Sequence, residues 1–178
     1  MHKKAYIYLI LLVAALVQIR LIPHPPNFTP VLAAGIFSGF YFRHFFLGLF
    51  IIILSMFIGD LYLGLHNTMF FTYISLAIAV MLGYFIKHLK FSGIIFSGLV
   101  SSVCFFLITN FGAWVTLDMY EKSFAGLVNS YTLAIPFFQN TLISTFLYLF
   151  LFKILFKFTI DKKKLLKIWF ERWIIAEI

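Results

Sequence analysis

The segment RLIPHPPNFTP at residues 20–30 places three kinds of polar side chain inside an otherwise apolar sequence. Arg20 offers a permanent positive charge, His24 a ring that can bind a proton, and Asn27 an amide that both donates and accepts hydrogen bonds. The prolines around them fix the backbone φ angle and disfavour a helix at the residues that precede them. We therefore predict a stiff, extended loop that presents His24 and Asn27 to a pocket.

Three later stretches add polar side chains to apolar surroundings. The first is GDLYLGLHNT, the second is TNFGAW, and the third is IPFFQN. In the third, a proline is followed by two amides within a predicted membrane helix, which indicates an opened backbone or a polar cavity rather than contact with lipid. The predicted ligand-binding residues are Arg20, His24, Asn27, Asp60, His66, Asn110, Trp114, Gln139 and Asn140.

The side chains in this set indicate binding rather than catalysis. Arginine and histidine suit an anionic group, tryptophan suits a flat ring, and the amides can orient a ligand by hydrogen bonds. Arg20, at the end of the first apolar segment, is also placed to face Asp60, either as part of the site or as a structural ion pair. The sequence lacks the HExxH, GxSxG and Walker motifs, and two histidines from different loops make a weak metal site. We expect no catalytic residue, metal or cofactor.

The composition is typical of an integral membrane protein. Of the 178 residues, 63% are hydrophobic and 11% are charged, so polar side chains are too few to cover a soluble domain. The net charge of +8 comes from short clusters between apolar runs, which argues against nucleic-acid binding. We expect a multi-pass protein of the bacterial cytoplasmic (inner) membrane, all α in fold class.

Six apolar segments are predicted to cross the membrane, a crossing that takes roughly 17–25 helical residues. They are residues 4–22, 29–43, 45–63, 69–87, 93–111 and 131–156, the second being short. If the N-terminus is cytoplasmic, 12 of the 14 basic residues fall inside, and only Arg20 and Lys122 fall outside. Basic residues favour the cytoplasmic side, so we predict that both termini are inside.

The C-terminal sequence DKKKLLKIWFERWIIAEI has a basic face and an apolar face with tryptophans. Such a helix is expected to lie among the headgroups of the cytoplasmic leaflet, or to dock a cytoplasmic partner. We therefore divide the chain into a six-helix transmembrane domain at 1–160 and an amphipathic tail helix at 161–178.

The stretches RLIPHPPNFTPVLAAGIFSG, GDLYLGLHNTMFFTY, SSVCFFLITNFGAW and GLVNSYTLAIPFFQNTL resemble an uncharacterised family of bacterial multi-pass membrane proteins. That family resembles, more distantly, the S-components of energy-coupling-factor (ECF) vitamin transporters. The resemblance implies a six-helix bundle with an outward-facing pocket, and a coupling protein with ATPases as partners. S-components often carry an Ala-x-x-x-Ala docking surface in their first helix, whereas this chain has only the adjacent Ala14 and Ala15 there.

These features favour a protein that binds a vitamin-like solute from the outer side, as the substrate-binding component of an uptake transporter. The alternative is a non-transporting scaffold of an envelope or cell-shape assembly. The scaffold would hold its partners through the basic tail and through Gly35 and Gly39, a small-xxx-small pair that also suits ordinary tight helix packing. A third hypothesis is a membrane enzyme that acts on a lipid or quinone with Arg20, His24 and Asp60.

Overall fold

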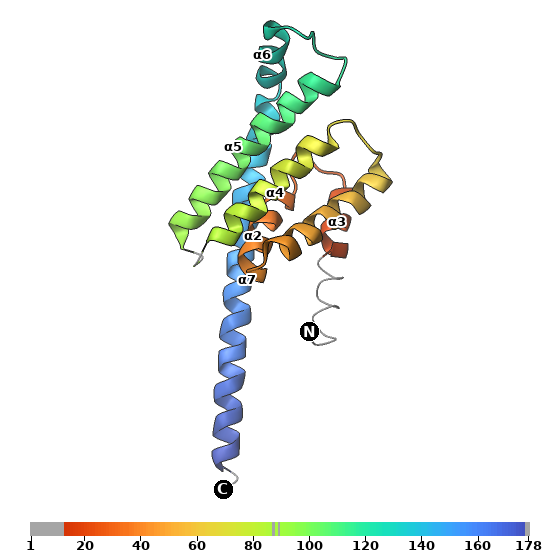
Figure 1. The fold of residues 1–178 in the computed structure, drawn as a ribbon. Coiled ribbons are helices and arrows are strands. Elements are labelled where there is room, and N and C mark those ends of the chain that lie inside the picture. The colour runs from red at the N-terminus through yellow and green to blue at the C-terminus, as the bar shows by residue number, and fades with distance from the viewer. Residues whose placement is uncertain (1–12, 87, 89, 177–178) are drawn as a thin grey trace.

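The computed structural model describes residues 13–86, 88 and 90–176, with side chains as far as residue 158. Within these ranges all regular secondary structure is helical (Figure 1). Residues 13–21 form the described part of a first helix. The helices that follow are α2 (Val31–Phe42), α3 (Phe45–Leu63), α4 (Met69–Phe85), α5 (Phe91–Thr116), α6 (Phe124–Thr132) and α7 (Ile135–Ala176).

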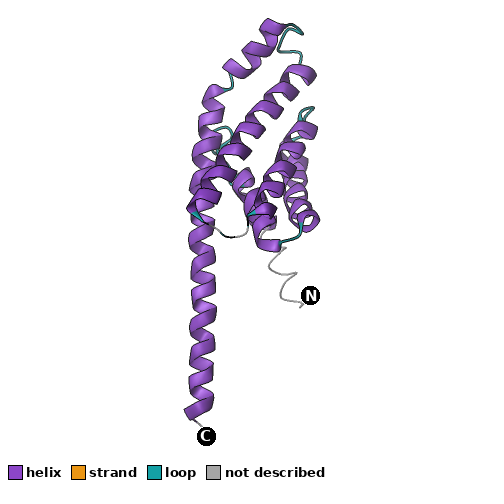
Figure 2. Ribbon diagram, turned by 60° about the vertical axis from the view of Figure 1, so that its left-hand side comes forward, coloured by secondary structure: helices purple, strands orange, loops and turns teal. Residues whose placement is uncertain are grey.

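The connections between the helices alternate between two ends of the bundle. The α3–α4 and α5–α6 connections lie toward the upper end in Figure 1, whereas the α2–α3 turn and the start of α5 lie toward the lower end. Toward its C-terminus α7 extends well past the other helices, as both views show (Figures 1 and 2). The polar loops that follow α3 and α5, two of the three predicted to share one side of a membrane, therefore lie toward the same end of the bundle.

Helix α2 is the centre of the core. Nine of its 12 residues are buried, because α3, α4 and α7 all pack around it. Phe37 of α2 lies 5.4 Å from Phe152 of α7, and Phe40 lies 5.5 Å from Phe156, both measured between ring centroids. Gly39 faces the backbone of α4, where a Cβ atom would lie only 2.7 Å from Tyr84 N. The Gly35 and Gly39 pair thus serves packing within the bundle.

Within the described residues, three helices are long and apolar enough to cross a membrane: α3, α5 and the part of α7 from Ile135 to Phe158. The predicted segment 45–63 coincides with α3, and 29–43 and 69–87 contain the shorter apolar helices α2 and α4. With 12 residues, α2 is too short to cross a bilayer as an α-helix, since about 17–25 residues are needed. Six crossings and their orientation stay predictions.

The last predicted segment, 131–156, differs from the structure at its start. The chain ends α6 at Thr132 and begins α7 at Ile135, so the interruption falls just before Pro136 rather than deeper in the helix. In the first turn of a helix the missing N–H of proline is not needed, which makes this a favourable place to begin α7. Helix α7 then runs without a break past residue 160, where we place the domain boundary. That division stays a prediction.

Candidate functional site

A cavity of about 340 Å³ lies between the loop at residues 22–30 and helices α2, α3, α4, α5 and α7. Four of the predicted site residues line it: Arg20, His24, Asn27 and His66. The apolar part of its wall includes Leu32 of α2, Leu76 of α4 and Phe105 of α5, and most of the polar residues that line it carry a hydroxyl group. The loop and the helices together therefore form a wall of mixed polarity.

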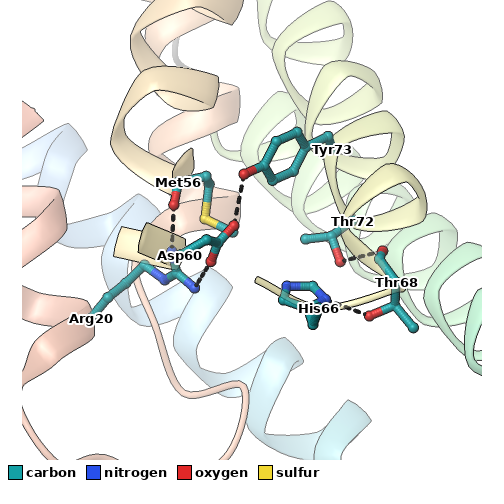
Figure 3. Close-up of polar contacts among 7 residues, drawn as sticks. All are labelled: Arg20, Met56, Asp60, His66, Thr68, Thr72 and Tyr73. Carbon is teal, nitrogen blue, oxygen red and sulfur yellow. Dashed lines mark hydrogen bonds and ion pairs between the residues drawn. The ribbon is translucent and has the colours of Figure 1, made fainter. Parts of the chain in front are cut away.

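Arg20 and Asp60 form the ion pair that their positions in the sequence predict. Arg20 Nη2 donates to Asp60 Oδ1 at 2.8 Å, and Arg20 Nη1 donates to the Met56 carbonyl at 3.0 Å (Figure 3). The second carboxylate oxygen accepts from the Tyr73 hydroxyl at 2.7 Å. Asp60 is only 1% exposed and Arg20 14% exposed, so Arg20 borders the cavity and Asp60 lies behind it. The pair joins the first helix to α3 and α4.

The absence of a side chain at Gly59 makes room for this arrangement. An added Cβ atom there would lie 2.6 Å from Arg20 Nη1, the nitrogen that bonds the Met56 carbonyl. A glycine one residue before the carboxylate therefore lets the guanidinium approach the α3 backbone.

The loop at 22–30 is tied to α7 by two side chains. Asn140 Nδ2 donates to the Pro26 carbonyl at 3.0 Å, and Ser144 Oγ shares its one hydrogen between the Thr141 carbonyl at 3.1 Å and the Asn27 carbonyl at 3.4 Å. Within the loop, Asn27 has a positive φ of 62°, a conformation that asparagine tolerates better than most residues. The predicted stiff loop is therefore held both by its own turn and by α7.

The two histidines at the cavity make local hydrogen bonds. His24 Nδ1 lies 2.9 Å from the Pro25 carbonyl, which can only accept, so this nitrogen carries the hydrogen. His66 Nδ1 lies 2.7 Å from the Thr68 hydroxyl, just before α4 (Figure 3). Both side chains are exposed on the described surface and border the cavity.

The remaining predicted site residues lie away from the main cavity. Asn110 lines a neighbouring pocket of about 40 Å³ and donates to the Phe106 carbonyl at 2.7 Å. Trp114 Nε1 donates to the Glu121 carbonyl at 2.9 Å, which holds the α5–α6 connection. Gln139 is exposed and lines neither cavity, whereas its neighbour Asn140 tethers the loop.

The prediction missed a set of hydroxyl side chains that make up much of the cavity wall. Part of the signal was in the sequence, because hydroxyls three or four residues apart lie on one helix face, as at 68 and 72 and at 141, 144 and 145. Serine and threonine are too common in membrane helices for this spacing alone to mark a site. The set is Thr29, Thr68, Thr72, Thr109, Thr141, Ser144 and Thr145.

Replacing Asn140 with alanine is expected to loosen the loop over the cavity. One hydrogen bond between α7 and the Pro26 carbonyl is lost, so the Phe28 and Thr29 amides, which bond within the loop, should exchange with deuterium about fivefold faster. Gln139→Ala removes an adjacent amide that touches neither cavity and should leave exchange unchanged. Equal exchange in the two variants would mean that α7 does not hold the loop.

Among the described residues, no group of three or more histidine, cysteine, aspartate or glutamate side chains is placed to hold a metal ion. Comparison with known sequences matches residues 1–168 to a family of unknown function, DUF6580. No curated protein and no solved structure matches the chain.

Proposed function

We propose, on the premise that this chain belongs to the DUF6580 family, that it is a membrane protein that binds a small, vitamin-like solute in the cavity beneath residues 22–30. The observation that carries the proposal is the cavity itself. Its volume of about 340 Å³ falls at the lower end of the roughly 300–1,000 Å³ typical of ligand pockets. Its wall combines apolar surface with a few groups that can fix the orientation of a ligand, as such pockets do.

The proposed role is that of a substrate-binding uptake component in the bacterial inner membrane, similar to an S-component. The three long apolar helices found in the described part of the chain and the clustering of basic residues between apolar segments support a membrane setting. The sequence contains no Walker motif, so any ATP-driven step would come from partner ATPases and a coupling protein. In this proposal the loop at 22–30 faces outward and closes over the solute.

The test is mass spectrometry, with an absorption spectrum, on small molecules extracted from the gently purified full-length protein. We expect one solute at close to one molecule per chain, and we expect Asn140→Ala to lower its occupancy because the loop is less firmly held. Phospholipid alone, found again after growth in vitamin-rich medium, would contradict the proposal.

One observation favours the scaffold as a second candidate function. Helix α7 continues to Ala176 and extends beyond the other helices, which gives a partner protein a long surface (Figures 1 and 2). The glycine pair proposed to serve a scaffold gives no support, since Gly35 and Gly39 both face α4. Phospholipid alone in the extraction experiment would favour this candidate.

A further inference from the structure

Four hydroxyl groups in the cavity wall have already used their hydrogen. Each donates to a backbone carbonyl of its own helix or of the residue that caps it: Thr72 at 3.3 Å, Thr109 at 2.7 Å, Thr141 at 2.9 Å and Ser144 at 3.1 Å. A hydroxyl whose hydrogen is committed can offer a ligand only its oxygen lone pairs. The cavity wall therefore offers four such acceptors, from Thr72, Thr109, Thr141 and Ser144.

His24 adds a further acceptor to the same wall. Its Nδ1 donates to the Pro25 carbonyl, so Nε2 of the neutral ring carries no hydrogen and can only accept. Thr145 is fully buried, and its Oγ1 has no hydrogen-bond partner within the described part of the chain, so it is free to accept as well as to donate. Acceptors therefore come from the loop and from α4, α5 and α7.

The permanent charge at the cavity is already balanced. Arg20 is the only lysine, arginine, aspartate or glutamate among the described residues that line it, and Asp60 pairs with it at 2.8 Å. An anionic ligand would therefore meet the lone pairs of these acceptors, neutral donors such as Thr145 Oγ1 and the Asn27 amide, and a guanidinium whose charge Asp60 offsets. A cationic ligand would meet Arg20 with no carboxylate in the wall.

We infer that the cavity selects an uncharged solute with at least two N–H or O–H donors, which bond the acceptor oxygens of Thr72, Thr109, Thr141 and Ser144. This inference rests on the proposed function, since it names the ligand class of the same cavity. It replaces the anionic group that arginine and histidine suggest when the sequence is taken alone, because the structure shows that Asp60 offsets the charge of Arg20 and that hydroxyl acceptors line the same cavity.

Matched pairs of probes test the ligand class. The full-length protein in lipid nanodiscs is titrated calorimetrically, up to millimolar concentration, with nicotinamide against nicotinate, pyridoxine against pyridoxine phosphate, and pyridoxine against its methyl ethers. We expect the uncharged, donor-bearing members to bind at least tenfold more tightly than their charged partners, and each methylated donor to weaken binding about fivefold. Tighter binding of the anionic members, or no effect of methylation, would overturn the inference and leave the proposed function standing.

If no probe binds, the solute extracted from the protein decides the question. A neutral solute with at least two donors supports the inference, and an anionic or donor-free one overturns it. Phospholipid alone would overturn both the inference and the proposed function.

A pair of substitutions on α5 tests the acceptor role itself. Thr109 and Thr116 each donate to the carbonyl four residues earlier, at 2.7 and 2.8 Å, but only Thr109 lines the cavity. Thr109→Val should weaken binding of the tightest neutral solute about fivefold, while Thr116→Val should leave its affinity unchanged. Equal affinities in the two variants, with both folded by thermal melting, would overturn the assignment of Thr109.

Discussion

Replacing Asp60 with alanine is expected to lower the free energy of unfolding by about 3–5 kcal/mol, because it leaves a largely buried guanidinium without its counter-charge. Arg20 is 14% exposed and has Asp60 as its carboxylate partner at 2.8 Å. The same change removes the acceptor of the Tyr73 hydroxyl. The measurement is equilibrium unfolding of the purified protein in detergent, with the wild type as reference.

A triple variant separates the charge effect from simple loss of packing. Arg20→Met, Asp60→Val and Tyr73→Phe together remove both charges and the hydroxyl, and of the three replacements only valine is larger than the residue it replaces, by about one methyl group. Such replacements of buried ion pairs are often neutral or stabilising, so most of the lost stability should return. If Asp60→Ala lowers the free energy of unfolding by less than about 1 kcal/mol, the pair contributes no more than an exposed salt bridge does, which would contradict the prediction.

The triple variant also decides between the two interpretations of the Arg20–Asp60 pair. If the pair is structural, the folded triple variant keeps its affinity for the solute that the wild type binds. If Arg20 also donates to that solute through the cavity that it borders, affinity falls although the protein stays folded. Measuring both stability and binding in one variant keeps these two roles apart.

Gly39→Ala is expected to lower the free energy of unfolding by about 3 kcal/mol, which is in the upper part of the range for overpacking a protein core. A Cβ atom at this position would overlap the Val80 carbonyl and lie 2.7 Å from Tyr84 N, so rigid backbone rather than a mobile side chain must move. On the facing helix, a Cβ atom at Gly83 would overlap the Ile36 carbonyl in the same way. The two helices would have to separate, and since α2 and α4 both line the cavity, solute binding should fall as well.

Gly35→Ala is the matched control, with the same substitution one turn earlier on the same helix. Its Cβ atom would lie 3.3 Å from Ala79 Cβ, a tight contact that a small adjustment can relieve. Alanine also favours a helix over glycine by roughly 1 kcal/mol, so stability should stay within about 1 kcal/mol of the wild type. Thermal melting in detergent compares the two variants. Equal melting temperatures would contradict the close α2–α4 contact.

The sequence predicted much of the helical framework because apolar length and proline position act locally. Segment 45–63 coincides with α3, and the prolines near His24 mark the loop that joins the first helix to α2. The pairing of Arg20 with Asp60 was also predictable, since a charged group at the end of one apolar segment needs a partner at the end of another. The break between α6 and α7 was harder to place, because a proline fits well inside the first turn of a new helix and α7 begins at Ile135, just before Pro136.

By itself the sequence determined that the described chain would be helical and apolar, and that its polar residues would gather toward one end. Only the tertiary structure decided which of them share a cavity. Asn140 reaches the Pro26 carbonyl while Gln139 is exposed, because adjacent helical residues point about 100° apart. Trp114 likewise donates to the Glu121 carbonyl and does not line the cavity. Threonines line the cavity instead, and the packing of the helices decides which threonines these are. Hydrophobicity and helix length are properties of a single segment. The set of side chains that line a cavity depends instead on the rotation of each helix about its own axis. Contacts between helices fix that rotation, such as the contact of Gly39 with α4.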